Sequence, residues 1–208
     1  ISMLETALRL CNGCHACYSF CPKKAIKMVA NTEGFLFPQI NNDLCIDCGL
    51  CEKICPVLNP ITKENEQTAA YVIINNDEEI RLQSSSGGVF SAIAQDVIKQ
   101  NGIVFGAKFD NDFNVVHGYT DSIEGLSDFR GSKYVQSAIG DSYKDCKNFL
   151  EEGRQVLFSG TPCQIAGLQS FLGKNYDNLL LVDIICHGVP SPLVWSEYKR
   201  TLEKKFAS

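Results

Sequence analysis

The order of apolar and polar residues divides the chain into a short region and a longer one. In the short region, residues 25–29 (AIKMV) and 34–40 (GFLFPQI) are brief apolar runs that predict two short strands. From residue 89 the spacing becomes that of an amphipathic helix, which Gly102 ends. The apolar face of that helix consists of Val89, Phe90, Ile93, Ala94, Val97 and Ile98.

Strand-like and helix-like patterns then alternate to the end of the chain. Strands are predicted at 103–109, 114–120, 155–160 and 179–186, and helices at 141–153 and 162–173. The run 70–75 (AYVIIN) is also rich in β-branched residues. Unbroken apolar runs such as 179–185 are typical of parallel strands that are buried on both faces. The alternation therefore predicts an α/β domain with a mainly parallel or mixed sheet and helices on its faces.

A polar linker separates the two regions. Residues 59–69 (NPITKENEQTA) lack apolar periodicity and contain Pro60. We therefore expect an α+β chain with one domain at 1–58 and an α/β domain at 70–208. The chain starts at Ile1 and stops inside a helical pattern, so we expect a fragment whose second domain is truncated at its C-terminus.

Composition and charge limit the kinds of partner. The 208-residue chain is 45% hydrophobic and 21% charged, which suits one or two globular domains. No apolar run approaches the roughly 18 residues that a spanning helix needs. The net charge of −5, with no basic cluster, argues against nucleic acid as a main partner. Nothing indicates a secretory signal, and the cysteines fall in tight runs, so a reducing, cytoplasmic location is expected.

Eight of the eleven cysteines form two copies of the motif C-x-x-C-x-x-C-x-x-x-C-P, at residues 11–22 and 45–56. The tight triad lets one loop wrap three corners of a 4Fe-4S cluster, and in two-cluster proteins the fourth cysteine ligates the other cluster. One predicted cluster is therefore held by Cys11, Cys14, Cys17 and Cys55. The other is held by Cys45, Cys48, Cys51 and Cys21.

Two zinc sites are the alternative interpretation of these cysteines. Zinc usually takes C-x-x-C pairs with a longer spacer, sometimes with histidine, whereas consecutive two-residue gaps followed by Cys-Pro favour clusters. His15 is interpreted as a loop residue, because cysteines already fill every cluster corner. Gly13, Ala16 and Gly49 are small enough to leave room beside the sulfurs.

Loops with small residues recur where the predicted strands and helices of the second domain meet. They are 84–88 (SSSGG), 159–164 (SGTPCQ) and 186–192 (CHGVPSP). In open α/β sheets ligands bind beyond the carboxyl ends of the strands, and helix N-termini present free N–H groups to anions. Because these loops follow the predicted iron–sulfur region along the chain, they indicate a cofactor that carries a phosphate group. A serine N-cap with a glycine turn is the alternative for 84–88.

Several motifs together resemble known families. Residues 8–58 resemble bacterial dicluster ferredoxins. Residues 83–94, 129–137, 157–168 and 183–192 resemble the family of coenzyme F-420 hydrogenase/dehydrogenase beta subunits, which includes a plant chlorophyll-derivative reductase. The resemblance implies an iron–sulfur flavoprotein oxidoreductase that passes electrons between two 4Fe-4S clusters and FAD. It also implies a redox partner protein, such as a ferredoxin, and a small-molecule hydride donor or acceptor.

The resemblance further implies which residues contact FAD. They are Ser86, Gly87, Gly88, Lys133, Tyr134, Gly160, Thr161, Pro162, Cys163, Gln164, His187 and Gly188. Lys133 could equally be a solvated surface residue and Tyr134 a core aromatic. No catalytic residue is assigned.

Two other functions remain open. One is an electron-carrier or docking component of a larger redox complex, without a flavin of its own. The other is a thiol-based enzyme that uses Cys163 with Cys186, although no C-x-x-C pair supports it. Cys163 begins a predicted helix and is interpreted as a packed cysteine beside a cofactor. Cys146 is interpreted as a core residue, and His117, in a strand pattern, as an ordinary histidine with satisfied hydrogen bonds.

Overall fold

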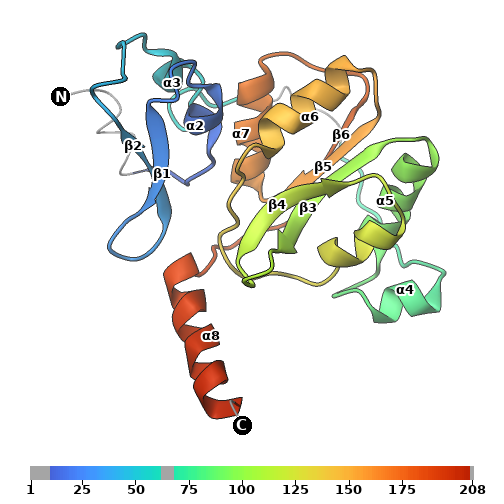
Figure 1. Ribbon diagram of the computed structural model, residues 1–208. Helices are drawn as coiled ribbons and strands as arrows, with labels where there is room; N and C mark the ends of the chain where they lie inside the picture. Colours follow the sequence, from blue (N-terminus) through green and yellow to red (C-terminus); the bar gives the residue numbers. More distant parts are fainter. Residues whose placement is uncertain (1–9, 62–67, 207–208) are drawn as a thin grey trace.

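The computed structural model describes residues 10–61 and 68–206 of the chain. A small cysteine-rich region lies beside a larger sheet region, with helix α7 between the two (Figure 1). Residues 62–67 of the predicted linker lie outside the described residues. The domain boundaries themselves stay a prediction.

The cysteine-rich region consists of two short helices and a hairpin. Helix α2 (Ala16–Phe20) and helix α3 (Leu50–Lys53) each begin inside a cysteine motif. Strands β1 (Ile26–Ala30) and β2 (Leu36–Ile40) pair antiparallel, with Ile26 opposite Ile40. The two short strands predicted from the apolar runs are confirmed.

A four-stranded mixed sheet forms the larger region. Its strands are β3 (Ile103–Phe109), β4 (Val115–Thr120), β5 (Val156–Gly160) and β6 (Leu179–Asp183), in the order β4-β3-β5-β6. Strand β3 runs parallel to β5, and β5 runs parallel to β6. Strand β4 is antiparallel, because a tight turn in which Asp110 accepts two backbone N–H groups leads straight into it.

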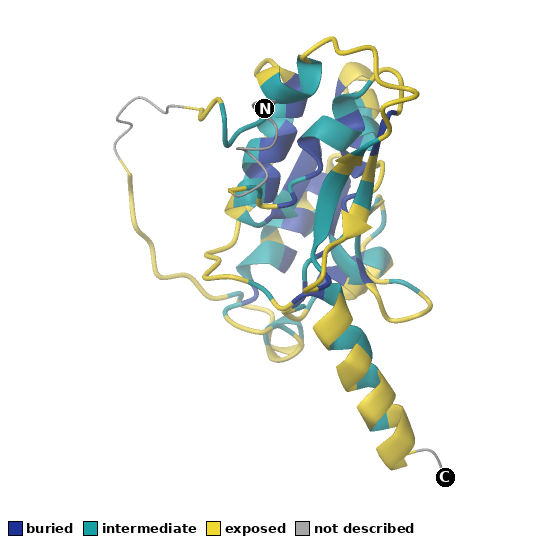
Figure 2. Ribbon diagram, turned by 90° about the vertical axis from the view of Figure 1, so that its left-hand side faces the viewer, coloured by how far each residue is buried: buried dark blue, intermediate teal, exposed yellow. Residues whose placement is uncertain are grey.

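Helices cover both faces of this sheet. The helices that pack on the sheet are α5 (Val89–Lys99), the 3-10 helix η1 (Glu124–Phe129), α6 (Ser142–Glu151) and α7 (Pro162–Leu172). Helices α4 (Glu78–Leu82) and α8 (Pro192–Phe206) lie away from its faces (Figure 1). Alternate residues of β3 face opposite sides, as strand geometry requires. Phe105 joins a core with α6 and α7, and Val104 joins a core with α5 and η1. Both cores are enclosed by the body of the sheet region (Figure 2).

The structure corrects two expectations about apolar runs. Residues 70–75 form no strand, and Tyr71, Val72, Ile73 and Ile74 are exposed. Strand β6 is not buried on both faces, since it is the edge of the sheet, and Leu180, Ile184 and Ile185 are exposed. An apolar run in the sequence does not show whether another strand will pair with it or a helix will pack on it.

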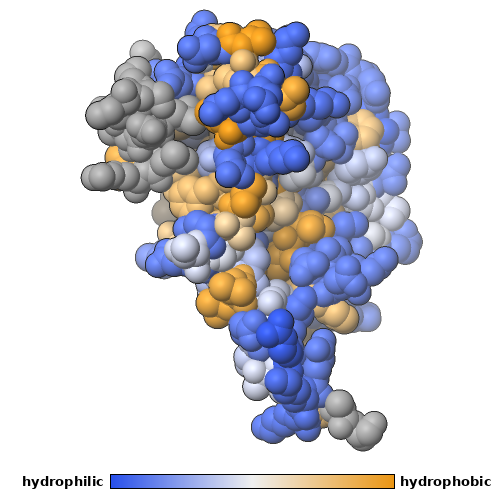
Figure 3. All heavy atoms as spheres, turned by 60° about the vertical axis from the view of Figure 1, so that its left-hand side comes forward, coloured by the Kyte–Doolittle hydropathy of each residue, from blue (hydrophilic) through white to orange (hydrophobic). Residues whose placement is uncertain are grey.

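Helix α8 projects from the body of the molecule (Figures 1 and 2). Along its 15 residues no side chain is buried. Apolar patches reach the surface above it, whereas the helix itself is mainly polar (Figure 3). Among the residues that the structure describes, no helix is both long and apolar enough to cross a membrane.

Candidate iron–sulfur and cofactor site

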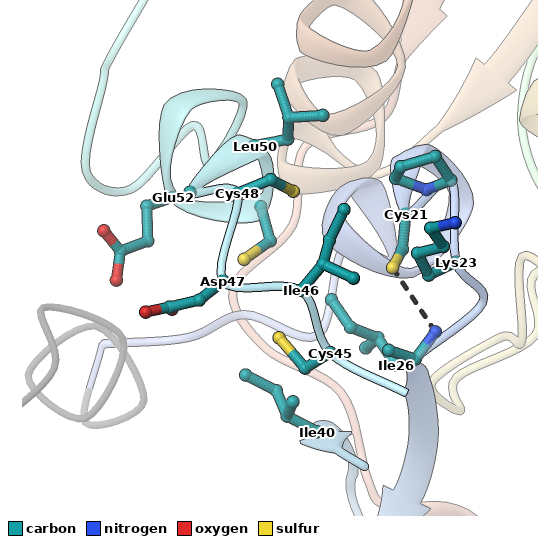
Figure 4. Close-up of a pocket in the computed structure, with 14 residues that line it drawn as sticks. Cys21, Lys23, Ile26, Ile40, Cys45, Ile46, Asp47, Cys48, Leu50 and Glu52 are labelled. Atoms are coloured by element: carbon teal, nitrogen blue, oxygen red, sulfur yellow. Dashed lines mark hydrogen bonds between the residues drawn. The ribbon is translucent and has the colours of Figure 1, made fainter. Parts of the chain in front are cut away.

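Four cysteines from both motif copies line one pocket of about 110 Å³. They are Cys21, Cys45, Cys48 and Cys51, called here the second cysteine set. Cys21 follows the C-terminus of α2, and the other three come from the loop and first turn of α3 (Figure 4). These four residues are the ones that the crossed ligand pattern predicts for one cluster.

The first cysteine set, Cys11, Cys14, Cys17 and Cys55, is gathered nearby. Burial raises the pKa of Cys14 to about 12, and the thiols of Cys11 and Cys55 contribute to this rise. Burial likewise raises the pKa of Cys17 to about 12, with Cys14 and Cys11 as neighbours. The mutual effect of these thiols shows that they lie close together, Cys55 of the second motif included.

Both cysteine loops share one backbone geometry. Gly13 and Asp47 occupy the same position of the motif and have φ of 65° and 52°; His15 and Gly49 have φ of 65° and 69°. This left-handed turn folds the backbone around the sulfurs. Gly13 donates its N–H to the Sγ of Cys11 over 3.4 Å, and Ala25 donates to the Sγ of Cys21 over 3.3 Å.

The donor set fits iron–sulfur chemistry. Two groups of four thiols, with backbone N–H groups aimed at sulfur, match the ligand type and the hydrogen bonding of such clusters. In residues 10–61 and 68–206 no three His, Cys, Asp or Glu side chains are gathered to hold a single metal ion. The ligand roles of the individual cysteines stay predictions.

His15 departs from its interpretation as a simple loop residue. It is the N-cap of α2, and its side chain is 3% exposed. Neither ring nitrogen has a hydrogen-bond partner among the described residues, and the same holds for the hydroxyl of Ser19 one turn later. Burial lowers the pKa of His15 to about 4, and the proximity of His117 contributes to this lowering.

The predicted cofactor loops form two adjoining pairs. Gly160 and Asp183 are paired at the ends of β5 and β6, so the loops after them start side by side. The loops at 84–88 and 130–134 also touch, because Ser132 donates its N–H to the Oγ of Ser85 over 2.8 Å. Gln136 joins the two pairs by donating its N–H to the carbonyl of Pro190 over 3.1 Å.

The glycines of the 84–88 loop are tightly packed. Gly88 is the N-cap of α5 with φ of 72°, as a left-handed glycine turn requires. A Cβ at Gly87 would lie 2.7 Å from the carbonyl oxygen of Ile73, and one at Gly88 would lie 3.1 Å from the Cβ of Asn75. The segment 73–75 therefore fills the space beside both α-carbons.

Other predicted cofactor residues differ in their surroundings. Lys133 donates its amine to the carbonyls of Asp128 and Arg130, and burial lowers its pKa. Tyr134 is 75% exposed, so it is not a core aromatic. Ser86, His187 and Gly188 are exposed as well.

A buried polar network, which the sequence pattern did not reveal in full, supports the loop after β5. Ser137 lies 3.0 Å from Nδ1 of His117 and accepts a hydrogen bond from Gln164 over 2.8 Å. Nε2 of His117 lies 3.1 Å from the carbonyl of Ser159. Gln164 in turn accepts the backbone N–H of Thr161 over 3.0 Å. His117 is thus a satisfied buried histidine, as expected, and Ser137 was the member missed.

The two parts of the site meet at Cys163. This residue lies in the first turn of α7, and its thiol contributes to the raised pKa of both Cys11 and Cys14. Its own Sγ lies 3.2 Å from the hydroxyl of Thr161. Cys146, by contrast, is fully buried in the core, as predicted. Cys186 is exposed, and no disulfide joins it to Cys163.

Comparisons with known proteins agree with this arrangement. Residues 10–59 match the family of 4Fe-4S dicluster domains. Residues 153–208 match the family that describes the C terminus of the coenzyme F420 hydrogenase/dehydrogenase beta subunit. Ferredoxin-1 of Caulobacter vibrioides is 49% identical over 47 residues, which is 22% of this chain and 41% of that protein.

Similarity also extends over most of the chain. The F polypeptide of the F(420)H(2) dehydrogenase of Methanosarcina mazei is 23% identical over 188 residues, 85% of this chain and 53% of that protein. An F420-reducing NiFe hydrogenase complex from Methanosarcina barkeri contains a chain with TM-score 0.47 and 17% identity, covering 68% of this chain and 52% of that one. The chain thus spans about half or less of the length of these curated relatives. Its residues 10–59 are similar to 4Fe-4S dicluster domains and its residues 153–208 to the C terminus of coenzyme F420 hydrogenase/dehydrogenase beta subunits, so the resemblance indicated by its motifs is confirmed.

Proposed function

We propose that this chain is the electron-transferring part of an iron–sulfur flavoprotein oxidoreductase. Each cysteine set holds one 4Fe-4S cluster, and FAD binds at the loops that follow β5 and β6 and precede α5. The observation that carries the proposal is the junction at Tyr143: its hydroxyl lies 2.8 Å from the carbonyl of Cys14 and 2.7 Å from the carbonyl of Gln164, in the first turn of α7 just after the loop that follows β5. A redox group at that edge of the sheet is therefore next to the first cysteine set.

The two cofactor types complement each other chemically. A cluster exchanges one electron, whereas a flavin exchanges one or two and so connects a cluster chain to a hydride donor or acceptor. The second cysteine set is more exposed than the first, since Cys45 and Cys48 are open to solvent. We therefore propose that a partner protein gives electrons to, or takes them from, the cluster of the second cysteine set.

The residues of this chain would hold FAD through helix N-termini. Helices α5 and α7 each have 11 residues and would direct the positive end of the helix dipole toward a phosphate. Free N–H groups would come mainly from the first turn of α5, because in α7 Pro162 has no N–H and the N–H of Gln164 is donated to Thr161. The network of His117, Ser137 and Gln164 fixes the backbone of Thr161, so the loop after β5 is rigid. The loop after β5 and the first cysteine set thus adjoin the same end of α7.

An electron carrier without flavin is the second candidate. Two observations favour it: segment 73–75 fills the space beside Gly87 and Gly88, and the Lys133 amine is already bound to two backbone carbonyls. Both leave fewer free groups for a phosphate. This candidate keeps the two clusters and assigns the hydride chemistry to another polypeptide of the complex.

Anaerobic cofactor analysis separates the candidates. The protein is purified without oxygen, incubated with FAD and desalted, and its iron, sulfide and flavin are measured. Iron and sulfide with about one FAD per chain support the flavoprotein. Iron and sulfide with no retained FAD support the carrier. One or two zinc ions and no sulfide would contradict both.

A further inference from the structure

The first cysteine set is docked on one face of α7. Cys163, Gly167 and Phe171 are spaced four residues apart and therefore lie along one side of this helix. Gly167 lies directly against Cys14. Phe171 packs edge-on against Phe20 of α2, with ring centroids 6.0 Å apart. One side of α7 therefore forms the seam between the cluster region and the sheet region.

Gly167 permits a very close approach at this seam. A Cβ at this position would lie 3.1 Å from the Cβ of Cys14, 3.1 Å from its carbonyl oxygen and 2.8 Å from the hydroxyl of Tyr143. Carbon atoms do not normally come so near to backbone oxygen, so a side chain here would push the cysteine loop away. The missing side chain brings the Cys14 backbone directly onto the helix.

Tyr143 of α6 fixes the loop in that place. Its side chain is fully buried, and its hydroxyl oxygen lies 2.8 Å from the carbonyl of Cys14 and 2.7 Å from the carbonyl of Gln164. The hydroxyl has one proton, so the two carbonyls share it as alternative acceptors. One carbonyl belongs to the cysteine loop and the other to α7, so the hydroxyl joins both sides of the seam at the residue beside the cluster.

We propose that Tyr143 is a positioning residue for electron transfer: its hydroxyl holds the Cys14 backbone, and with it the cluster of the first cysteine set, against α7. The inference rests on the proposed clusters but not on FAD. When the O–H is donated to the Cys14 carbonyl, the positive end of its dipole points toward the cysteine loop. Because reduction adds negative charge to the cluster, this dipole favours the reduced state. Tyr143 does not line the pocket of the second cysteine set, so its effect is confined to one cluster.

The test compares Tyr143→Phe with Tyr18→Phe in the anaerobically purified protein. Tyr18 lies in α2 beside Cys17 and is half-buried, but its hydroxyl is not joined to Cys14. Redox titration followed by electron paramagnetic resonance measures both clusters. We expect Tyr143→Phe to keep its iron and sulfide and to shift one midpoint potential to a more negative value. Tyr18→Phe is expected to leave both potentials unchanged.

The shifted signal is assigned with Cys21→Ala, which removes a thiol of the second cysteine set. Potentials in Tyr143→Phe equal to those of the wild type would overturn the proposal, and so would an equal shift of both clusters or the loss of both. Gly167→Ala gives an independent check, since it should disturb the signal of the first cysteine set alone. A wild type without any cluster signal would instead refute the proposed function.

Discussion

Cys21 and Cys45 line the same pocket, although they belong to different copies of the cysteine motif. Cys17, only four residues before Cys21, has Cys14 and Cys11 of its own motif as its main neighbours, and Cys51 of the second cysteine set makes a smaller contribution to its raised pKa. Helix α2 lies between Cys14 and Cys21 and carries the chain from one cysteine set to the other. The shared pocket fits the predicted crossing, in which each set contains three cysteines of one motif and the fourth cysteine of the other.

This crossing predicts a selective effect of Cys21→Ala. The wild type should contain about eight iron atoms and eight sulfides per chain, from two four-iron clusters. The variant should lose the signal of the second cysteine set and keep that of the first, as measured by iron assay and electron paramagnetic resonance. Cys146→Ala, which changes a buried cysteine outside both sets, is the control. Loss of the other signal would contradict the crossed assignment.

The cysteine sets could be predicted from the sequence because motif spacing is a local property. The spacing between Cys17 and Cys21 fits one short helix, and the loop geometry follows from the same spacing in both copies. The amphipathic helix α5 and the strands of the sheet also followed from local periodicity. For these elements the spacing of cysteines and apolar residues in the sequence agrees with the structure that forms.

Features that depend on distant contacts could not be predicted. In the sequence Tyr143 belongs only to the apolar face of a helix, because its partner Cys14 is 129 positions away. The exposure of residues 70–75 and of β6 has the same cause: an apolar run does not state which neighbour covers it. Gly167 is an ordinary helix residue in the sequence, and only the packed loop shows why no side chain fits.

Gly88→Val tests the role of the loop before α5. Valine is strained at a φ of 72°, at a cost of about 1–2 kcal/mol, and its side chain would press on Asn75. The loop should move, its N–H groups should no longer converge on a phosphate, and retained FAD should fall several-fold. Cluster absorbance should stay unchanged.

Gly153→Val is the matched control for this variant. Gly153 also has a positive φ, of 79°, but open space surrounds the position of its Cβ, and it lies after α6, away from the loops. Valine there carries the same kind of backbone strain. Equal FAD content in the two variants would show that Gly88 acts only as a helix cap.

Cys163→Ser tests whether this thiol is a cluster ligand. Cys55 is predicted to complete the first cysteine set, so iron and sulfide should remain at the wild-type level in the variant. Serine keeps the contact with the Thr161 hydroxyl and nearly the volume of the side chain. An iron assay that showed loss of one cluster would mean that Cys163, rather than Cys55, supplies the fourth thiol.

His117 gives a prediction about pH and stability. Burial lowers its pKa from 6.5 to about 4, so the folded protein keeps the imidazole neutral. In the unfolded chain the same imidazole takes up a proton as the pH falls below about 6.5. Its contribution to stability is therefore fully present above pH 6.5 and is lost as the pH falls toward 4. Between pH 7 and pH 5 the loss should be about 2 kcal/mol in the free energy of unfolding.

His117→Gln isolates this contribution. Glutamine keeps amide groups that can pair with Ser137 and the Ser159 carbonyl, but it does not titrate. Carboxylates titrate in both proteins, so they cancel when the two pH dependences are subtracted, whereas the smaller contribution of His117 to the lowered pKa of His15 is removed together with His117. Anaerobic denaturant unfolding at pH 7 and pH 5 should show a smaller loss of stability in the variant than in the wild type. If both proteins lose the same free energy between these pH values, His117 is not held neutral by burial, and the rigid loop after β5 does not depend on a neutral imidazole.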